Sequence, residues 1–363
     1  MTQIHALYVA LATGTPVFLW GPAGVGKSAT ITTIAQHLQW PLETIIAAIY
    51  ESIDISGLPL LAGDAVAFAP PGWVRRLAEV ERGILFLDEL PQAKESVIAG
   101  LLRVVRERMA GEHALAPGVS IVAAGNPPKA TYGGMDLLAQ MANRFCHLPW
   151  TCSYPAWAEG MLLGWPMPTL PPLTPWAHEV LPARALIIGF LDKHRALLLQ
   201  EPQDEVAAGQ AWPSPRSWDL AANLLAGCRA WQLMDVAPEL VTGCVGEGPA
   251  LEFLQWLKTL DLPDPEAVLS VAAKFPWPKR TDVAAVILNS AIAAVLAELT
   301  PERWLQGWEL LGNAARSQLK DLGALAARTL AKHRPDSRTR PPLAHLEPYA
   351  KILDAAGITM WKE

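Results

Sequence analysis

The chain has little charge and little cysteine. Charged residues make up only 18% of its 363 residues, while hydrophobic residues make up 51%, so the composition favours a compact folded protein over disorder. Lys and Arg number 29 against 35 Asp and Glu, a balance that weakens any model in which a broad basic face binds nucleic acid. The 4 cysteines form no C-x-x-C pair and the 8 histidines no H-E-x-x-H, so ordinary reduced thiols are expected.

Targeting and membrane-spanning signals are also lacking. The N-terminus, MTQIHALYVALATGTPVFLW, has neither a basic start nor a small-residue cleavage site, which argues against a signal peptide. The most apolar later stretch, 283–299, is interrupted by Asn289, Ser290 and Glu298, so a buried helix is expected there and no membrane span. These features predict a soluble, cytoplasmic protein.

Short apolar runs alternate with helical stretches between about residues 16 and 150. This alternation predicts an α/β fold, a P-loop NTPase core with a parallel sheet and helices on both faces. Two Gly/Pro-rich breaks, 57–73 and 109–118, predict a hairpin or loop on the surface. The expected strands are VFLW (17–20), ETIIAAI (43–49), ILFLDE (84–89), VSIVAAGN (119–126) and FCHLPW (145–150).

The second half of the chain reads as helical. Proline is dense from 149 to 182, which disfavours long helices and favours an extended connector. Apolar residues at helical spacing follow, and Trp304 and Trp308 among them are expected in a core rather than on a partner-binding face. The length favours two or three units. We therefore expect a nucleotide-binding core at 1–152, an α-helical lid with the connector at 153–265, and an α-helical extension at 266–363.

The segment GPAGVGKS fits the pattern G-x-x-x-x-G-K-[S/T]. Its glycines let the loop curl so that backbone N–H groups point at phosphates, and a helix N-terminus follows. Lys27 would reach the β and γ phosphates, and the Ser28 hydroxyl would ligate magnesium. A strand before and a helix after favour a true P-loop over a glycine-rich turn with an exposed lysine. The predicted nucleotide-binding residues are Gly21, Pro22, Ala23, Gly24, Val25, Gly26, Lys27, Ser28 and Ala29.

The apolar strand ILFLDEL ends in two carboxylates. Asp88 would hold magnesium through water and Glu89 would polarise the attacking water; the alternative is a strand whose acidic end is merely solvated. Together with the P-loop, this pair predicts a hydrolase that acts on a nucleotide bound with Mg2+. The residues alone do not separate ATP from GTP, and ATP is the expected cofactor only because of the family resemblance that follows.

In their order along the chain, GPAGVGKS, ILFLDEL and VSIVAAGN resemble the motifs of AAA+ ATPases. The segments DISGLP, FAPPGWVRRL, MANRFCHLPW and WPSPRSW are similar to the MoxR branch. The resemblance implies that Asn126 is a sensor for the lytic water, although it could merely cap the turn before Pro127. It also implies that Arg144 is an arginine finger for a neighbouring subunit, rather than a surface ion pair, and that Arg216 is the second sensor. Arg184 is the competing candidate for the last role.

The resemblance further implies a homo-oligomeric ring, a hexamer in the preferred reading, that couples ATP hydrolysis to remodelling or activating a protein partner. Such ATPases are often paired with a von Willebrand factor A domain protein, here a separate chain. The alternatives are a nucleic-acid-directed motor or a defence or restriction subunit, and a nucleotide-gated scaffold with negligible turnover. The breaks at 57–72 and 109–118 contain no Lys or Arg, so a protein substrate is favoured over nucleic acid.

Overall fold

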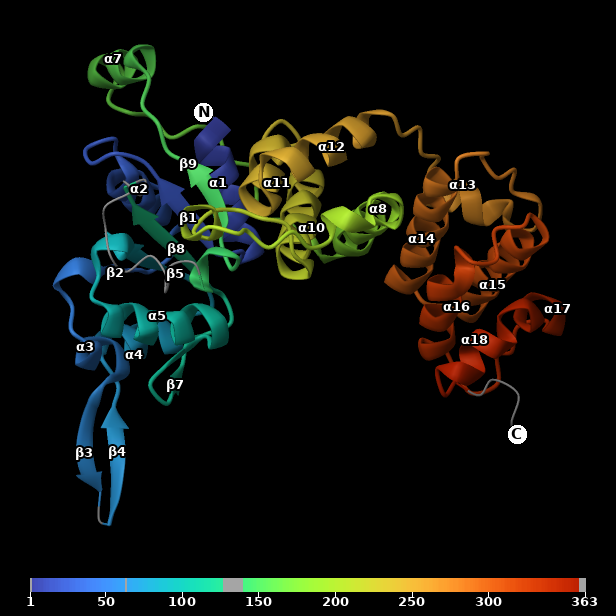
Figure 1. The fold of residues 1–363 in the computed structure, drawn as a ribbon, viewed down its shortest axis with the longest axis horizontal. Helices are drawn as coiled ribbons and strands as arrows, with labels where there is room; N and C mark the ends of the chain where they lie inside the picture. The colour runs from blue at the N-terminus through green and yellow to red at the C-terminus, as the bar shows by residue number, and fades with distance from the viewer. Residues whose placement is uncertain (1, 63, 127–139, 359–363) are drawn as a thin grey trace. The chain divides into compact units, whose positions relative to one another are not determined.

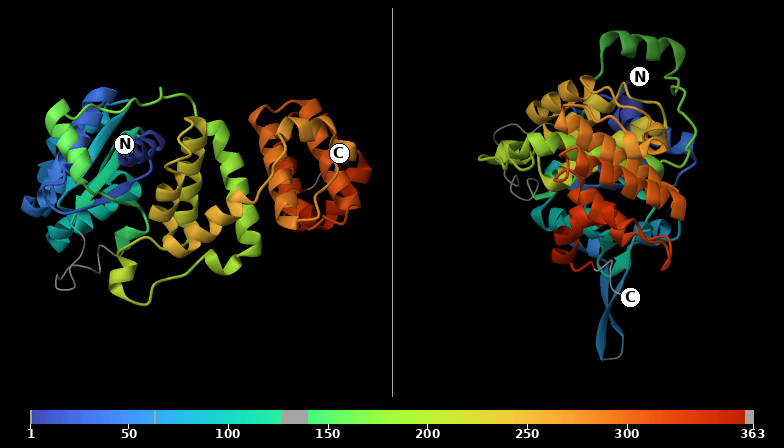
Figure 2. Two further views of the ribbon diagram at one scale, coloured as in Figure 1. Left: turned by 90° about the horizontal axis from the view of Figure 1, so that it is seen from above. Right: turned by 90° about the vertical axis from the view of Figure 1, so that its right-hand side faces the viewer.

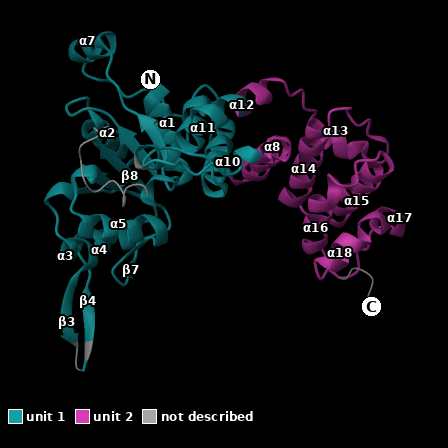
Figure 3. Cartoon of the chain, viewed as in Figure 1, with its two compact units in different colours: residues 1–176, 196–252 teal, residues 177–195, 253–363 magenta. Residues whose placement is uncertain are grey.

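A computed structural model describes residues 2–62, 64–126 and 140–358. The chain forms two compact units (Figures 1 and 3). Unit 1 comprises residues 1–176 and 196–252, and unit 2 comprises residues 177–195 and 253–363. The expected division into core, lid and extension stays a prediction.

A five-stranded sheet forms the centre of unit 1, in the order β2-β5-β8-β1-β9. Every neighbouring pair in it is parallel, as predicted from the five apolar runs. Since β5, β8 and β1 are neighbours, their carboxyl ends lie at one edge, where parallel sheets bind ligands. The strands are β1 (Val17–Trp20), β2 (Leu42–Ile46), β5 (Gly83–Asp88), β8 (Val119–Gly125) and β9 (Cys146–Pro149).

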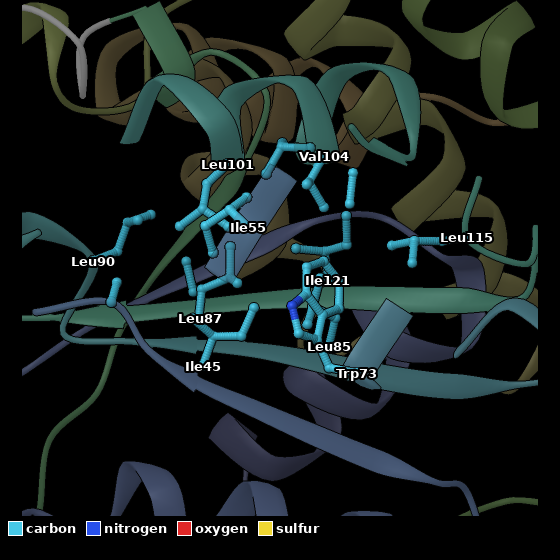
Figure 4. Packing of buried hydrophobic residues seen from close by; sticks show 14 of the residues in the cluster. Ile45, Ile55, Trp73, Leu85, Leu87, Leu90, Leu101, Val104, Leu115 and Ile121 are labelled. Carbon is cyan, nitrogen blue, oxygen red and sulfur yellow. The ribbon is translucent and has the colours of Figure 1, made fainter. Parts of the chain in front are cut away.

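Helices cover both faces of this sheet. Side chains alternate between the faces along each strand, so Leu85 and Leu87 join a core with α3 (Ser52–Ser56), α4 (Gly72–Ala78) and α5 (Glu95–Glu107), part of which Figure 4 shows. The opposite face packs against α1 (Thr2–Thr13) and α2 (Lys27–Leu38), and there the Ser120 hydroxyl donates to the Leu11 carbonyl at 2.7 Å. The predicted α/β core is confirmed.

Both Gly/Pro-rich breaks are antiparallel hairpins. The first, β3 (Leu58–Ala62) with β4 (Ala65–Ala69), extends away from the sheet (Figures 1 and 2). The second, β6 (Met109–Ala110) with β7 (His113–Ala114), is much shorter. The first hairpin exposes apolar side chains, and Leu61 at 87% is the most exposed of them. Such exposure is unfavourable in a free chain, and exposed apolar surface of a protein often marks a contact site.

Unit 1 continues in helices after the sheet. These are α7 (Tyr154–Leu163), α9 (Glu205–Ala208), α10 (Pro215–Ala230), α11 (Ala237–Val245) and the start of α12 (Glu247–Lys258). Helix α7 lies within the proline-rich segment, where an extended connector was expected. It forms because Ser153 caps it, accepting a hydrogen bond from Ala156 N, and because Pro155 occupies the first turn, where proline is tolerated.

Unit 2 is all α. Trp304 and Trp308 are fully buried in its core, as predicted. The side chain of Asp282 is 1% exposed and pairs with Lys193 and Arg280, each at 2.7 Å. Across the described residues no helix is long and apolar enough to span a membrane. The helices are α8 (Val180–Lys193), the end of α12, α13 (Pro265–Ser270), α14 (Thr281–Ala297), α15 (Pro301–Arg316), α16 (Gly323–Lys332), α17 (Leu343–Leu346) and α18 (Ala350–Ala355).

Candidate nucleotide site

The loop between β1 and α2 has a backbone conformation that requires glycine at several positions. Gly24 and Gly26 have φ angles of +82° and +92°, and a Cβ atom on either would enter open space. That space lies where backbone N–H groups at the start of α2 can meet an anion. Gly21 is needed for another reason, because a Cβ atom there would lie 2.2 Å from the Trp150 carbonyl oxygen. The Gly21 N–H donates to the Gly125 carbonyl at 3.1 Å, which anchors the loop to the end of β8.

Lys27 begins α2 and folds back over the loop. Its side chain is largely buried, and Nζ donates to the carbonyl oxygens of Gly21 at 2.6 Å and Pro22 at 2.9 Å. Burial lowers the pKa of Lys27, and the nearby charge of Asp88 opposes that shift. These two carbonyl oxygens therefore hold the lysine beside the loop.

The end of β5 brings two carboxylates to the same edge. Asp88 accepts from the Ser28 hydroxyl at 2.8 Å through Oδ2 and from the Glu89 N–H at 3.0 Å through Oδ1. Glu89 has a φ of +54° and is exposed. This left-handed backbone is uncommon for a non-glycine residue, and it turns the chain into the short 3₁₀ turn η2 (Leu90–Gln92).

One cavity of about 320 Å³ is lined by the P-loop, the start of α2, and the ends of β5 and β8. Sequence reasoning predicted most of its lining, including Asn126, which directly follows β8. It missed Gln92 and Gly125. Gly125 packs so closely that a Cβ atom on it would lie 2.4 Å from the Pro91 ring. No motif pointed to Gln92, which reaches the cavity because η2 turns back toward the loop. The lining residues are Ala23, Gly24, Val25, Gly26, Lys27, Ser28, Ala29, Asp88, Glu89, Gln92, Gly125 and Asn126.

The residues present suit a nucleotide with a hard divalent cation. The two open positions at Gly24 and Gly26 form a cradle that any side chain would fill. The Ser28 hydroxyl and the Asp88 carboxylate lie together and offer the oxygen ligands that Mg2+ prefers. A second cavity, of about 360 Å³, borders the same loop and is lined also by Trp157, Trp165 and Met167. Its aromatic lining has the chemistry to hold a flat apolar ring.

Two predicted arginines do not line the P-loop cavity of about 320 Å³, since neither Arg144 nor Arg216 is among the described residues around it. They lie near each other. The pKa of Arg144 is lowered first by burial and then by the positive charges of Arg216 and Arg106. Within the described chain, Arg144 donates to the Gln140 carbonyl and Arg216 has no hydrogen bond or ion pair. Arg184 lies on α8, in unit 2.

Residues 16–145 match the family model of the AAA domain, dynein-related subfamily. The match includes strands β1, β2, β5 and β8 of the sheet, the P-loop and the carboxylates of β5. It identifies this segment, less than half of the chain, as an AAA domain. That is the kind of nucleotide-binding P-loop domain found in ATPases. No curated protein sequence matches the chain.

Several solved structures are similar to the chain at low identity. A candidate ATPase from Cytophaga hutchinsonii is 12% identical, with a TM-score of 0.44, and the match covers 72% of this chain and 90% of that one. A full-length MCM homologue from Methanopyrus kandleri is 17% identical over 66% of this chain and 54% of that one, with a TM-score of 0.39. A point mutant of RuvB from Thermotoga maritima is 16% identical over 83% of this chain and 86% of that one, with a TM-score of 0.29.

Proposed function

We propose that this chain is a MoxR-like AAA+ ATPase that hydrolyses ATP in a homo-oligomeric ring and uses that energy to remodel or activate a protein partner. The observation that carries the proposal is the convergence of Lys27, the Ser28–Asp88 pair and Glu89 on one cavity. Their charges and donors complement a polyphosphate and its metal ion.

In this proposal the P-loop residues bind and the residues at the ends of β5 and β8 act on water. The N–H groups of the loop and Lys27 bind the phosphates, while Ser28 and Asp88 hold Mg2+. When bound, MgATP supplies the phosphoryl group to be transferred and neutralises part of its charge. Glu89 accepts a proton from the attacking water, and Asn126 orients that water. The cavity lined by Trp157 and Trp165 would take the base.

The arginine pair favours an assembly over a monomer. Two neighbouring guanidinium groups repel each other unless an anion lies between them. Arg144 and Arg216 are close enough to do so, and neither lines the cavity of its own chain among the described residues. Their proposed ligand is the nucleotide of the adjoining subunit, where positive charge stabilises the transferred group. A hexamer is the proposed ring.

The surface favours a protein partner over nucleic acid. The hairpins carry no Lys or Arg, and nucleic-acid binding depends on cationic contacts with phosphates. The longer hairpin instead exposes Leu58, Leu61 and Val66, which suit contact with apolar side chains of a protein. A separate von Willebrand factor A domain protein is the proposed link between ring and target.

The test is steady-state ATP and GTP hydrolysis across protein concentration, with light scattering on the same samples. We expect turnover to rise with a ring-sized species, and to be lost in Glu89→Gln and Arg144→Ala. Arg75→Ala, which removes an exposed arginine on α4, is the matched control and should keep full activity. Full activity in a monomer, untouched by Arg144→Ala, would remove the ring, and strong stimulation by DNA would favour the nucleic-acid motor.

A further inference from the structure

One buried asparagine joins the two segments that carry the arginines. Asn143 is 6% exposed. Its Nδ2 donates to the Trp212 carbonyl at 3.0 Å, and its Oδ1 accepts from the Ser214 hydroxyl at 2.5 Å. Asn143 directly precedes Arg144, and Ser214 directly precedes the helix that contains Arg216. The side chain of Asn143 therefore bridges the turn of one arginine and the helix start of the other.

Ser214, the residue to which Asn143 is hydrogen-bonded, is the N-terminal cap of α10. The Ser214 hydroxyl accepts from the Ser217 N–H at 3.1 Å, and the Ser217 hydroxyl accepts from the Ser214 N–H at 2.8 Å. This reciprocal cap fixes the first helical turn, and Arg216 stands in that turn. Both serines are buried and hydrogen-bonded, so the network holds together out of contact with water. Asn143 thus ties the turn before Arg144 to the helix start that carries Arg216.

The network holds these charges where they are unfavourable in the free chain. Arg216 adds a positive charge to the first turn of a helix, the end where the macrodipole favours anions. Arg144 lies within the field of Arg216 and is itself partly buried. Neither arginine is paired with a carboxylate among the described residues. A support that keeps two neighbouring cations together is most useful when an anion arrives from another molecule.

We infer that Asn143 is a positioning residue: it holds Arg144 and Arg216 as one preformed pair directed at the polyphosphate bound by a second copy of this chain. The inference rests on the proposed function, because it requires hydrolysis at a site shared between copies. Preformed geometry matters here because misplacement of a catalytic group by about 1 Å can lower turnover on the order of a hundredfold.

The first test compares Asn143→Ala and Ser214→Ala with Asn313→Ala. Asn313 is the matched control, because it is also buried, at 7% exposed, and its Nδ2 donates to the carbonyls of Ala272 at 2.9 Å and Phe275 at 3.0 Å, all in unit 2. We expect the first two variants to lower kcat by roughly tenfold to a hundredfold and leave the affinity for a fluorescent ATP analogue unchanged. Asn313→Ala should keep the kcat of the wild type. If Asn143→Ala does not fold, Ser214→Ala carries the test.

The second test mixes variants. Copies with Asn143→Ala keep an intact P-loop, and copies with Lys27→Ala keep an intact arginine pair. If Asn143 acts on a neighbouring copy, mixing the two should give more ATPase activity than the sum of the separate proteins. A merely structural effect within one copy would give no such gain. Absence of rescue with folded variants, or a kcat for Asn143→Ala and Ser214→Ala equal to that of Asn313→Ala, would overturn the inference.

The outcomes also separate this inference from the proposed function. If the wild type shows no ATPase activity, or if Arg144→Ala and Arg216→Ala leave it unchanged, the proposed function fails and the inference fails with it. If both arginine variants lose turnover while Asn143→Ala and Ser214→Ala retain it, the ring ATPase stands and only the positioning role of Asn143 is refuted.

Discussion

Acidification should destabilise unit 1 through His147. This residue of β9 is 7% exposed. Its Nδ1 accepts from the Trp20 indole at 2.8 Å, so Nε2 carries the proton and donates to the Ala142 carbonyl at 2.9 Å. Burial lowers the pKa of His147 to about 4, although the Ala142 carbonyl opposes that shift by accepting from the ring. The neutral ring connects the last residue before the P-loop with the turn that carries Arg144.

The size of the effect follows from the two pKa values. The folded pKa is about 4, against an ordinary value of 6.5, so the unfolded chain binds more protons between these limits. The contribution of His147 to stability is therefore complete above about pH 6.5 and is lost as the pH falls toward about 4. A difference of roughly 2.5 units corresponds to about 3 kcal/mol. Domains are typically stable by only about 5–15 kcal/mol, so this loss should be measurable.

The comparison is between the wild type and His147→Gln. The glutamine amide can accept from Trp20 and donate to Ala142, but it does not titrate. Guanidinium unfolding would be followed at about pH 7.5 and 4.5 by hydrogen exchange in peptides from β1 and β9. We expect the wild type to lose about 2–3 kcal/mol more than the variant. His345→Gln, a control at a half-buried histidine in unit 2, should leave these peptides unchanged. Equal losses in wild type and His147→Gln would refute the reasoning.

Three further predictions concern single positions. Lys27→Ala should weaken binding of a fluorescent ATP analogue by about tenfold or more, because it removes a charge-assisted contact to phosphate; an unchanged Kd would contradict its role. Gly26→Ala should lower the free energy of unfolding by about 1–2 kcal/mol, because φ is +92° there, and should also weaken binding of the ATP analogue. Gly14→Ala, with a φ of +69° and open space around its Cβ position, should lower stability without weakening that binding. Fluorescence titrations and thermal melts of both variants measure the two effects. Asp282→Asn should destabilise unit 2 by about 3 kcal/mol in calorimetry, because Lys193 and Arg280 lose their shared carboxylate; a loss below about 1 kcal/mol would show that these half-exposed cations are satisfied by water.

The sheet and its loop were predictable because local patterns determine them. Runs such as VFLW (17–20) and ILFL (84–87) are apolar throughout, as is typical of strands buried on both faces, and GPAGVGKS has a spacing that few other structures need. The structure confirms these strands and their parallel pairing. The roles assigned to Glu89, Asn126, Arg144 and Arg216 stay predictions, because a motif names a residue type without showing the reaction.

The features that could not be predicted depend on contacts between residues that are far apart in the sequence. Asn143 and Ser214 lie 71 positions apart, and neither residue alone signals a bridge. Helix α7 was missed because the density of proline outweighed the short proline-free stretch after Pro155. The packing of α8 against α14 was not predictable either, because the apolar spacing of α8 shows that it packs somewhere without naming the partner. Only the folded chain shows that Gly189 faces Val286 closely enough for a Cβ atom to lie 2.4 Å from it.

The path of the chain limits how the protein can be shortened. It passes between the units at residues 176–177, 195–196 and 252–253, so unit 2 is not a simple tail. A chain ended after residue 265 would keep α8, including the contacts of Phe190 with Phe253 and Trp256, but would lose α14, against which α8 packs. Such a truncation would expose apolar side chains of α8. If the truncated protein were insoluble, that result would therefore say nothing about whether unit 2 takes part in the activity. Removing unit 2 cleanly requires replacing 177–195 by a short linker as well.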